Sequence, residues 1–302
     1  MPEIVRSNVP SITGAALVRP APARTAPVRL GRVRPALVRL GRVRPALVSV
    51  ALALVAVLML FPLALAQRFS TGQEVMDAMA DQAAPRTTIA SLTMTITAAS
   101  GHSLTREMQI WTTTGDDDAG ANQLIKFTGP ADVRGSGFMS VGGADGSTES
   151  YIYLPALDRV RRVAGGQEQD AFFGSDFSYE DITGLTGDVE GDFTYTLLET
   201  RAGPTYVIEG VPTDSADTSY ERVVYEVDEA LLLPTRIEFY RGGELYKLMT
   251  ISQTIEQDGF RLPTEIRMET VAAGSFTTLV QSGFELDTEI PDDVFTERFL
   301  RR

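Results

Sequence analysis

Six charged residues close together in the middle of the chain form its densest set of groups that could do chemistry. They are Arg159, Arg161, Arg162, Asp176, Glu180 and Asp181. Such a set can make ion pairs that hold a loop against a strand, or it can bind a polar head group. Alternate residues of a strand share a face, so Arg159 and Arg161 should point one way and Arg162 the other. We expect an ion-pair network, with one arginine face left for a head group.

The chain is very poor in histidine and cysteine, on which many catalytic sites are built. His102 is the single histidine and lies in a predicted hairpin turn, and there is no cysteine. A histidine-based triad, a zinc site of histidine and cysteine, and a disulfide are therefore excluded. No phosphate-binding glycine motif is present either. We expect a protein that is not an enzyme and that needs no cofactor or metal.

The first 66 residues differ in composition from the rest. Residues 1–47 are rich in arginine and contain the decamer VRLGRVRPAL twice, and residues 48–66 form an apolar run ending in Ala64-Leu65-Ala66. A basic flank, an apolar stretch and small residues before the cleavage point are typical of a signal peptide. We expect cleavage after Ala66 and export to the periplasm; an uncleaved inner-membrane anchor is the alternative. The basic repeat is interpreted as a disordered extension or as sequence upstream of the true start.

The remaining residues, 67–302, are strongly acidic. Nine of the 27 basic residues but only one of the 40 acidic residues precede Gln67, so this part carries a net charge of −21. A surface of that sign repels nucleic acid, which we exclude as a partner. The length suits a single β-rich domain.

After Pro85 the sequence alternates between apolar and polar residues. Leu92, Met94 and Ile96 alternate with serine and threonine, and the same period recurs in later segments as far as Leu286. Glycine-containing turns such as Gln257-Asp258-Gly259 separate these segments. The pattern predicts a meander of about ten antiparallel strands with one apolar face.

Few helices are predicted. Thr71 and Glu74 form a capping box that starts a helix over 72–83, with Met76 and Met79 on one face. A helical turn is predicted near 178–184. Methionine side chains are flexible and suit an adaptable contact surface, although ordinary core packing would also use them.

Two phrases within one segment carry a family resemblance. Residues 153–162 read YLPALDRVRR and residues 172–181 read FFGSDFSYED. Together they resemble the hallmark of the LolA-like outer-membrane lipoprotein-sorting family, with departures at Asp158 and Phe173. The resemblance extends more loosely from Gln73 to the C-terminus.

The resemblance implies a mainly β fold in which a curved antiparallel sheet forms an incomplete barrel and a few helices act as plug or lid. An apolar cavity inside such a sheet would bind acyl chains. We expect the lid to contribute Met76 and Met79. The residues expected to line the cavity are Met94, Ile96, Ile110, Phe127, Phe138, Tyr153, Phe172, Phe177 and Tyr225.

The preferred functional hypothesis is a periplasmic carrier, or chaperone, for the acyl chains of a lipoprotein or lipid. Its partners would include an inner-membrane exporter or an outer-membrane receptor. The alternative is a sensor or interaction domain of the same fold that docks on a membrane partner. An enzyme such as a lipid esterase is disfavoured because the only histidine lies in a turn.

Overall fold

The computed structural model describes residues 68–115, 120–143, 146–185, 193–198, 204–214, 216, 218–291 and 293–302. Residues 66–302 form one compact unit. The basic repeat and the expected signal peptide lie outside the described residues. Within those residues, every helix is too short or too polar to span a lipid bilayer.

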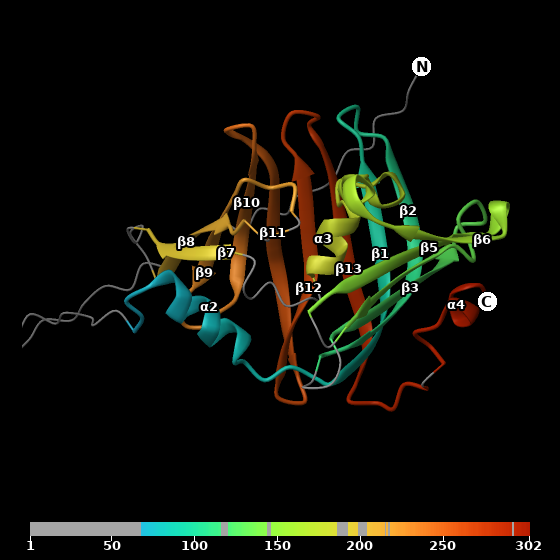
Figure 1. Cartoon of the computed structure of the whole chain (residues 1–302), viewed down its shortest axis with the longest axis horizontal. Coiled ribbons are helices and arrows are strands. Elements are labelled where there is room, and N and C mark those ends of the chain that lie inside the picture. Colours follow the sequence, from blue (N-terminus) through green and yellow to red (C-terminus); the bar gives the residue numbers. More distant parts are fainter. Residues whose placement is uncertain are drawn as a thin grey trace, which may run out of the picture. The chain divides into compact units, whose positions relative to one another are not determined.

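Thirteen antiparallel strands form one sheet in the described part of the chain (Figure 1). The first six are β1 (Thr87–Thr97), β2 (Ser103–Thr113), β3 (Asn122–Gly129), β4 (Gly137–Gly142), β5 (Thr148–Leu154) and β6 (Arg159–Val163). The others are β7 (Phe193–Leu197), β8 (Thr205–Pro212), β9 (Arg222–Asp228), β10 (Pro234–Arg241), β11 (Glu244–Gln257), β12 (Phe260–Thr270) and β13 (Ser275–Leu286).

The sheet consists of two meanders joined at its centre. Strands β1 to β6 run in sequence order to one edge, β7 to β13 run from the other edge, and β1 pairs with β13 between them. The sheet stays open because β6 and β7 are edge strands, which confirms the incomplete antiparallel barrel. The predicted ten strands were too few. Strands such as β4 are not predicted because residues 137–140 are buried on both faces, so apolar and polar residues do not alternate there.

In the described residues, three short α-helices and three 3₁₀ helices accompany the sheet. They are α2 (Gly72–Ala80), α3 (Tyr179–Gly184), α4 (Glu297–Leu300), η1 (Pro155–Leu157), η2 (Gly165–Gln169) and η3 (Phe172–Gly174). The capping box of Thr71 and Glu74 is present, and α2 ends at Ala80, three residues before the predicted end. Helix α2 packs against β7 and β8.

The segment Gly165–Leu185, which we call the plug, contains η2, η3 and α3. It belongs to the connection from β6 to β7, which are the two opposite edges of the sheet. That connection must pass from one edge to the other, and Figure 1 shows α3 in front of the central strands. The topology therefore places the plug over one face of the sheet.

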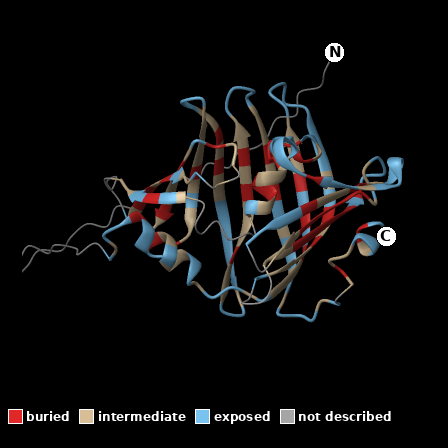
Figure 2. Ribbon diagram, viewed as in Figure 1, coloured by how far each residue is buried: buried red, intermediate tan, exposed pale blue. Residues whose placement is uncertain are grey.

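Apolar residues are buried on both faces. The face under the plug, here the inner face, carries the largest cluster, which includes Met94, Phe127 and Met268. A second cluster on β7–β9 lies beneath α2. The opposite or outer face carries Leu124, Met139 and other residues under the C-terminal segment. Figure 2 shows the buried residues concentrated in the middle of the strands and at α3.

Candidate functional site

Strand register brings most of the expected cavity residues onto the inner face. Met94, Ile110, Phe127 and Phe138 are buried members of its cluster, while Ile96 and Tyr225 are partly buried and pack against it. Pairing of Ile110 with Ile125 in the β2–β3 ladder fixes the shared face of these two strands. Strand parity thus places apolar side chains from both meanders on the inner face, and we call this apolar surface the floor.

The plug fills the space above this floor with aromatic side chains. Phe172 and Phe177 are almost completely buried, as is Ile182 of α3. The Phe172 ring centroid lies 6.1 Å from that of Phe127 and 5.6 Å from that of Phe138. The two expected loop residues therefore reach the inner face, but as part of the plug that covers it.

A buried carboxylate anchors α3 to the sheet. Asp181 Oδ2 lies 2.7 Å from the Nζ atom of Lys247 on β11 and accepts the backbone N–H of Ser178 at the same distance. The hydroxyl of Tyr220 donates to Asp181 Oδ1 at 2.6 Å. Burial, followed by the charge of Asp181, raises the pKa of Tyr220 far above its ordinary value, so the phenol remains a donor. Both oxygens of Asp181 are thereby satisfied.

Two further acids tie the plug to the sheet through hydroxyl groups. Asp176 accepts from Ser275 Oγ at 2.5 Å and from Thr277 Oγ1 at 2.7 Å, both on β13. Glu180 accepts hydrogen bonds from Thr218 and Ser219, just before β9. The plug is thus held at separate points of the sheet by polar contacts around an apolar centre.

The expected pairing between the arginines and these acids is wrong. Among the described residues, Arg162 pairs with Glu149 at 3.0 Å, and no ion pair joins Arg159, Arg161 or Arg162 to Asp176, Glu180 or Asp181. The physical reason is topology: the acids leave the β6 edge and cross to the centre of the sheet. The opposite orientation of neighbouring arginines is confirmed, since Arg161 pairs with Ile152 and Arg162 with Tyr151 in the ladder.

Tyr153 is also placed differently from the expectation. It packs with Leu124, Val294 and Leu300 on the outer face, and its hydroxyl donates to Asp158 at 3.2 Å. The inner-face residue of β5 is its neighbour Ile152, which packs against the inner cluster. The expectation for Tyr153 as a cavity residue is therefore wrong, because its strand parity points it away from the plug.

The two expected lid methionines cover only one end of the inner face. Met76 and Met79 pack against the cluster of Tyr195, Tyr206 and Ile208 on β7 and β8. Tyr225 contacts this cluster and the plug cluster, so the two are continuous. Gly72 fits α2 closely to β7, since a Cβ there would lie 2.8 Å from the Thr196 carbonyl carbon.

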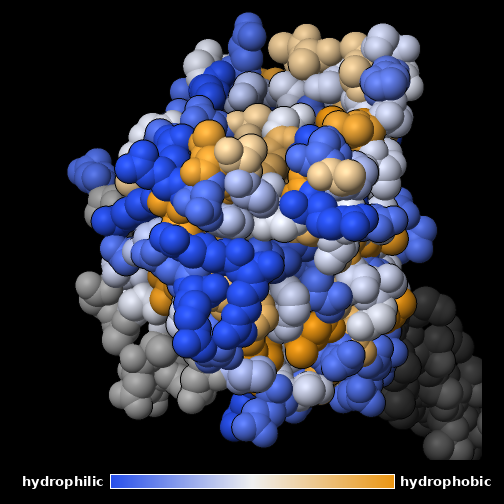
Figure 3. Space-filling model, turned by 90° about the vertical axis from the view of Figure 1, so that its right-hand side faces the viewer, coloured by the Kyte–Doolittle hydropathy of each residue, from blue (hydrophilic) through white to orange (hydrophobic). Residues whose placement is uncertain are grey.

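The outer face has its own covering, the C-terminal segment, which the structure describes at residues 290–291 and 293–300. Lys126 anchors it, because its Nζ donates to the Leu300 carbonyl at 2.6 Å and to the Gly135 carbonyl at 3.0 Å. Burial without a paired carboxylate lowers the pKa of Lys126 to about 8. Figure 3 looks onto the side of β6 and α4 and shows a mainly hydrophilic surface with small hydrophobic patches.

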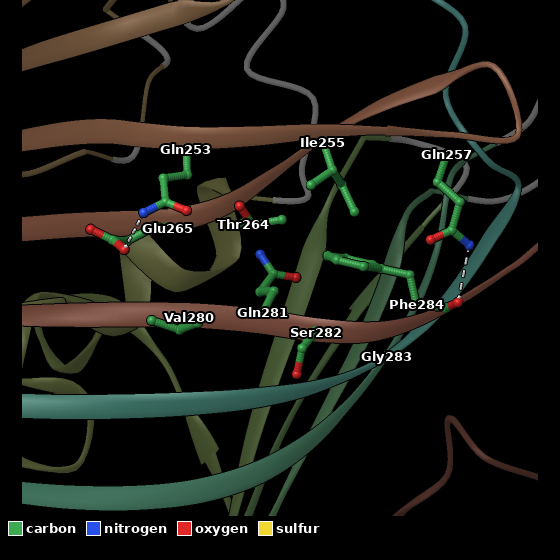
Figure 4. Close-up of a pocket in the computed structure, with 10 residues that line it drawn as sticks. All are labelled: Gln253, Ile255, Gln257, Thr264, Glu265, Val280, Gln281, Ser282, Gly283 and Phe284. Carbon is green, nitrogen blue, oxygen red and sulfur yellow. Dashed lines mark hydrogen bonds between the residues drawn. The ribbon is translucent and has the colours of Figure 1, made fainter.

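A groove of about 470 Å³ lies where the sheet splits. The β12–β13 ladder ends at the pair Glu265–Val280, although both strands continue beyond it. Figure 4 shows Ile255 and the Phe284 ring reaching into this space, while Gln257 Nε2 donates to the Phe284 carbonyl at 3.2 Å. None of the expected cavity residues lines the groove.

Sequence reasoning missed the residues outside the plug that hold it in place. Lys247, Tyr220, Ser275 and Thr277 lie far along the chain from the acids that they contact. One indication was available: Lys247 lies on β11 in phase with Met249, which predicts a lysine on an apolar face. Within the described ranges, no group of three or more acidic or histidine side chains is arranged to hold a metal ion.

Comparisons with known proteins agree with this architecture. A family model described only as an uncharacterized protein matches residues 120–302. A DUF1329 family protein from Desulfovibrio piger is 28% identical over 76% of this chain and 97% of its own, with a TM-score of 0.70. An outer membrane lipoprotein-sorting protein domain from Vibrio parahaemolyticus is also 28% identical, over 76% and 98%, with a TM-score of 0.69.

A third solved structure supports the fold alone. It is a LolA superfamily protein from Nitrosomonas europaea, 21% identical over 76% of this chain and 100% of its own, with a TM-score of 0.61. No curated protein matches the sequence. The family model spans more than half of the chain, and two solved structures share both fold and sequence with it. The chain therefore belongs to the family of that model, and it has the LolA-like fold of outer-membrane lipoprotein-sorting proteins.

Proposed function

We propose that this protein is a carrier that binds the acyl chains of a lipoprotein or lipid on the inner face of its sheet. The observation that carries the proposal is the construction of the plug. Apolar strands from both meanders form a continuous floor, and this floor is covered by an irregular segment attached through a few polar contacts. A floor of this kind is suited to exchange one apolar cover for another.

The energetics of acyl binding support a removable cover. Each methylene transferred from water contributes about 0.8 kcal/mol, so a chain of sixteen carbons offers on the order of 12 kcal/mol before costs. Displacing Phe172, Phe177 and Ile182 offsets part of that gain, because these side chains are buried in the closed state. The offset keeps binding reversible, as a carrier requires.

The carrier role fits export to the periplasm after cleavage behind Ala66, and transfer from an inner-membrane exporter to an outer-membrane receptor. Delivery would then depend on differences in affinity between successive partners, without a nucleotide or metal. The similarity to a lipoprotein-sorting domain supports this choice of ligand. Such a role requires no catalytic group.

Binding of a synthetic triacylated lipopeptide tests the proposal. We expect the full chain, purified after expression, to bind it at micromolar concentration. Ile96→Asp places a carboxylate on the inner face and should weaken binding sharply. Ser91→Asp is the matched control, since it introduces the same group on an exposed position of the same strand. Failure of the unmodified protein to bind any acyl probe would favour the interaction-domain alternative.

A further inference from the structure

The ion pair beneath the plug raises a problem for any opening of the inner face. Lys247 is only 4% exposed, and among the described residues it is the one buried cation on this face. Its Nζ atom pairs with Asp181, which belongs to the plug. If the plug moved away with its carboxylate, an ammonium group would remain on an apolar floor without a counter-charge. Stranding a buried charge in this way is strongly unfavourable.

The sheet side of this contact remains arranged for an anion when Asp181 is removed. Lys247 comes from β11, and Tyr220 comes from the segment before β9, so neither belongs to the plug. They donate to the two different oxygens of one carboxylate, at 2.7 and 2.6 Å. An ammonium and a phenol fixed in this way would donate hydrogen bonds equally well to the oxygens of another anionic group.

Apolar side chains continue directly from this pair of donors. Met249 follows Lys247 on the same face of β11, and it pairs with Met268 in the β11–β12 ladder. Both methionines are almost fully buried in the inner cluster. The floor thus combines one anion-binding point with an adjoining apolar track.

We propose that Asp181 occupies the place of an anionic group on the ligand, and that the ligand of this site is an acyl chain joined to an acid. The carboxylate of a fatty acid and the phosphate of a lysophospholipid share this chemistry. Binding would replace Asp181 at Lys247 and Tyr220, so that the ammonium keeps a counter-charge while the plug moves. This inference rests on the proposed acyl-carrier function and specifies which acyl ligand opens the plug.

The test compares ligands with the same chain and different head groups. Palmitate and palmitoyl lysophosphatidylglycerol carry an anion, whereas palmityl alcohol does not. Acetate and inorganic phosphate supply the anion without the chain. We expect the full-length protein to bind both anionic lipids at least about tenfold more tightly than the alcohol, because charge-assisted hydrogen bonds are lost with the neutral head group. Acetate and inorganic phosphate should compete only weakly with either anionic lipid.

Two variants test whether the site of Lys247 and Asp181 causes the preference for anionic lipids. The double variant Lys247→Met/Asp181→Asn removes both charges without stranding either, so it should fold and bind all three lipids with similar affinity. Lys126→Met removes the only other lysine of the chain, on the outer face, and should keep the tenfold preference. Amide hydrogen exchange of residues 172–182 should accelerate when palmitate binds to the unmodified protein.

The outcomes separate this inference from the carrier role. Equal binding of palmitate and palmityl alcohol by the unmodified protein would overturn the anionic site and leave the carrier role standing. If the double variant still prefers the anionic lipids, other cations such as Arg106 beside Phe127 cause that preference. This result would also overturn the inference. Binding of no acyl compound would reject both proposals.

Discussion

The two lysines of this chain anchor the two coverings of the sheet, and they do so by different chemistry. Lys247 holds the plug through a carboxylate, whereas Lys126 holds the C-terminal segment through two backbone carbonyls. A carboxylate contact can be exchanged for another anion, but a pair of carbonyls from fixed segments offers no such exchange. The proposed exchange of Asp181 for another anion therefore applies to the inner covering and has no counterpart at the outer covering.

The largest expected effect concerns the plug anchor. Asp181→Ala leaves the buried ammonium of Lys247 without its partner, and removing one member of a buried ion pair costs about 3–5 kcal/mol. We expect the free energy of unfolding, measured by chemical denaturation, to fall by about that amount. Glu297→Gln on the exposed surface of α4 should change it by less than about 0.5 kcal/mol. An equally small loss for Asp181→Ala would mean that the ion pair with Lys247 does not contribute to the free energy of unfolding.

The outer anchor should give a smaller effect. Lys126→Met removes hydrogen bonds to the carbonyls of Gly135 and Leu300 and leaves both carbonyls partly unsatisfied, which costs about 1–3 kcal/mol. Part of that cost is offset because a desolvated ammonium is also removed. Trp111, the only tryptophan, contacts Phe299 edge-on at 5.9 Å, so its fluorescence reports on the C-terminal segment.

We expect the Trp111 emission to shift to the red in Lys126→Met, because the C-terminal segment loosens from the outer face. The same emission should stay unchanged in Asp181→Ala at denaturant concentrations where that variant is still folded. Red shifts of equal size in both variants would contradict the independence of the two coverings.

The outer anchor should also give a pH dependence of stability. Burial lowers the pKa of Lys126 to about 8 in the folded protein, below the ordinary value of about 10.4 that applies in the unfolded chain. Between these values the unfolded chain binds more protons, so this group makes stability rise as pH increases from about 8 to about 10. The rise should appear in the melting temperature of the unmodified protein relative to that of Lys126→Met. A difference that is constant or falls across this window would contradict the assignment.

The sequence predicts the inner floor better than it predicts the plug anchors. Period-two alternation places Met94, Ile96 and Ile110 on one face, and the structure agrees because strand parity is a local property. Tyr153 lies on the opposite face from its neighbour Ile152, and the expectation that places Tyr153 in the cavity does not take this parity into account. Proximity in sequence predicts that the acids of the plug pair with the nearest arginines. Their partners lie on β11, on β13 and in the segment before β9 instead, and only the arrangement of the whole sheet brings these parts beneath the plug.

The central pairing of β1 with β13 has a consequence for how the domain is made. Each meander consists of hairpins between neighbours in the chain, so it can form early from local contacts. The seam between the meanders joins partners such as Thr88 and Leu286, near opposite ends of the described domain, and closing so long a loop is entropically costly and slow. Assembly of the complete sheet therefore waits for the last strand to emerge. Until then β1 remains an edge strand, and its backbone N–H and C=O groups are unpaired on the side that β13 covers in the complete sheet.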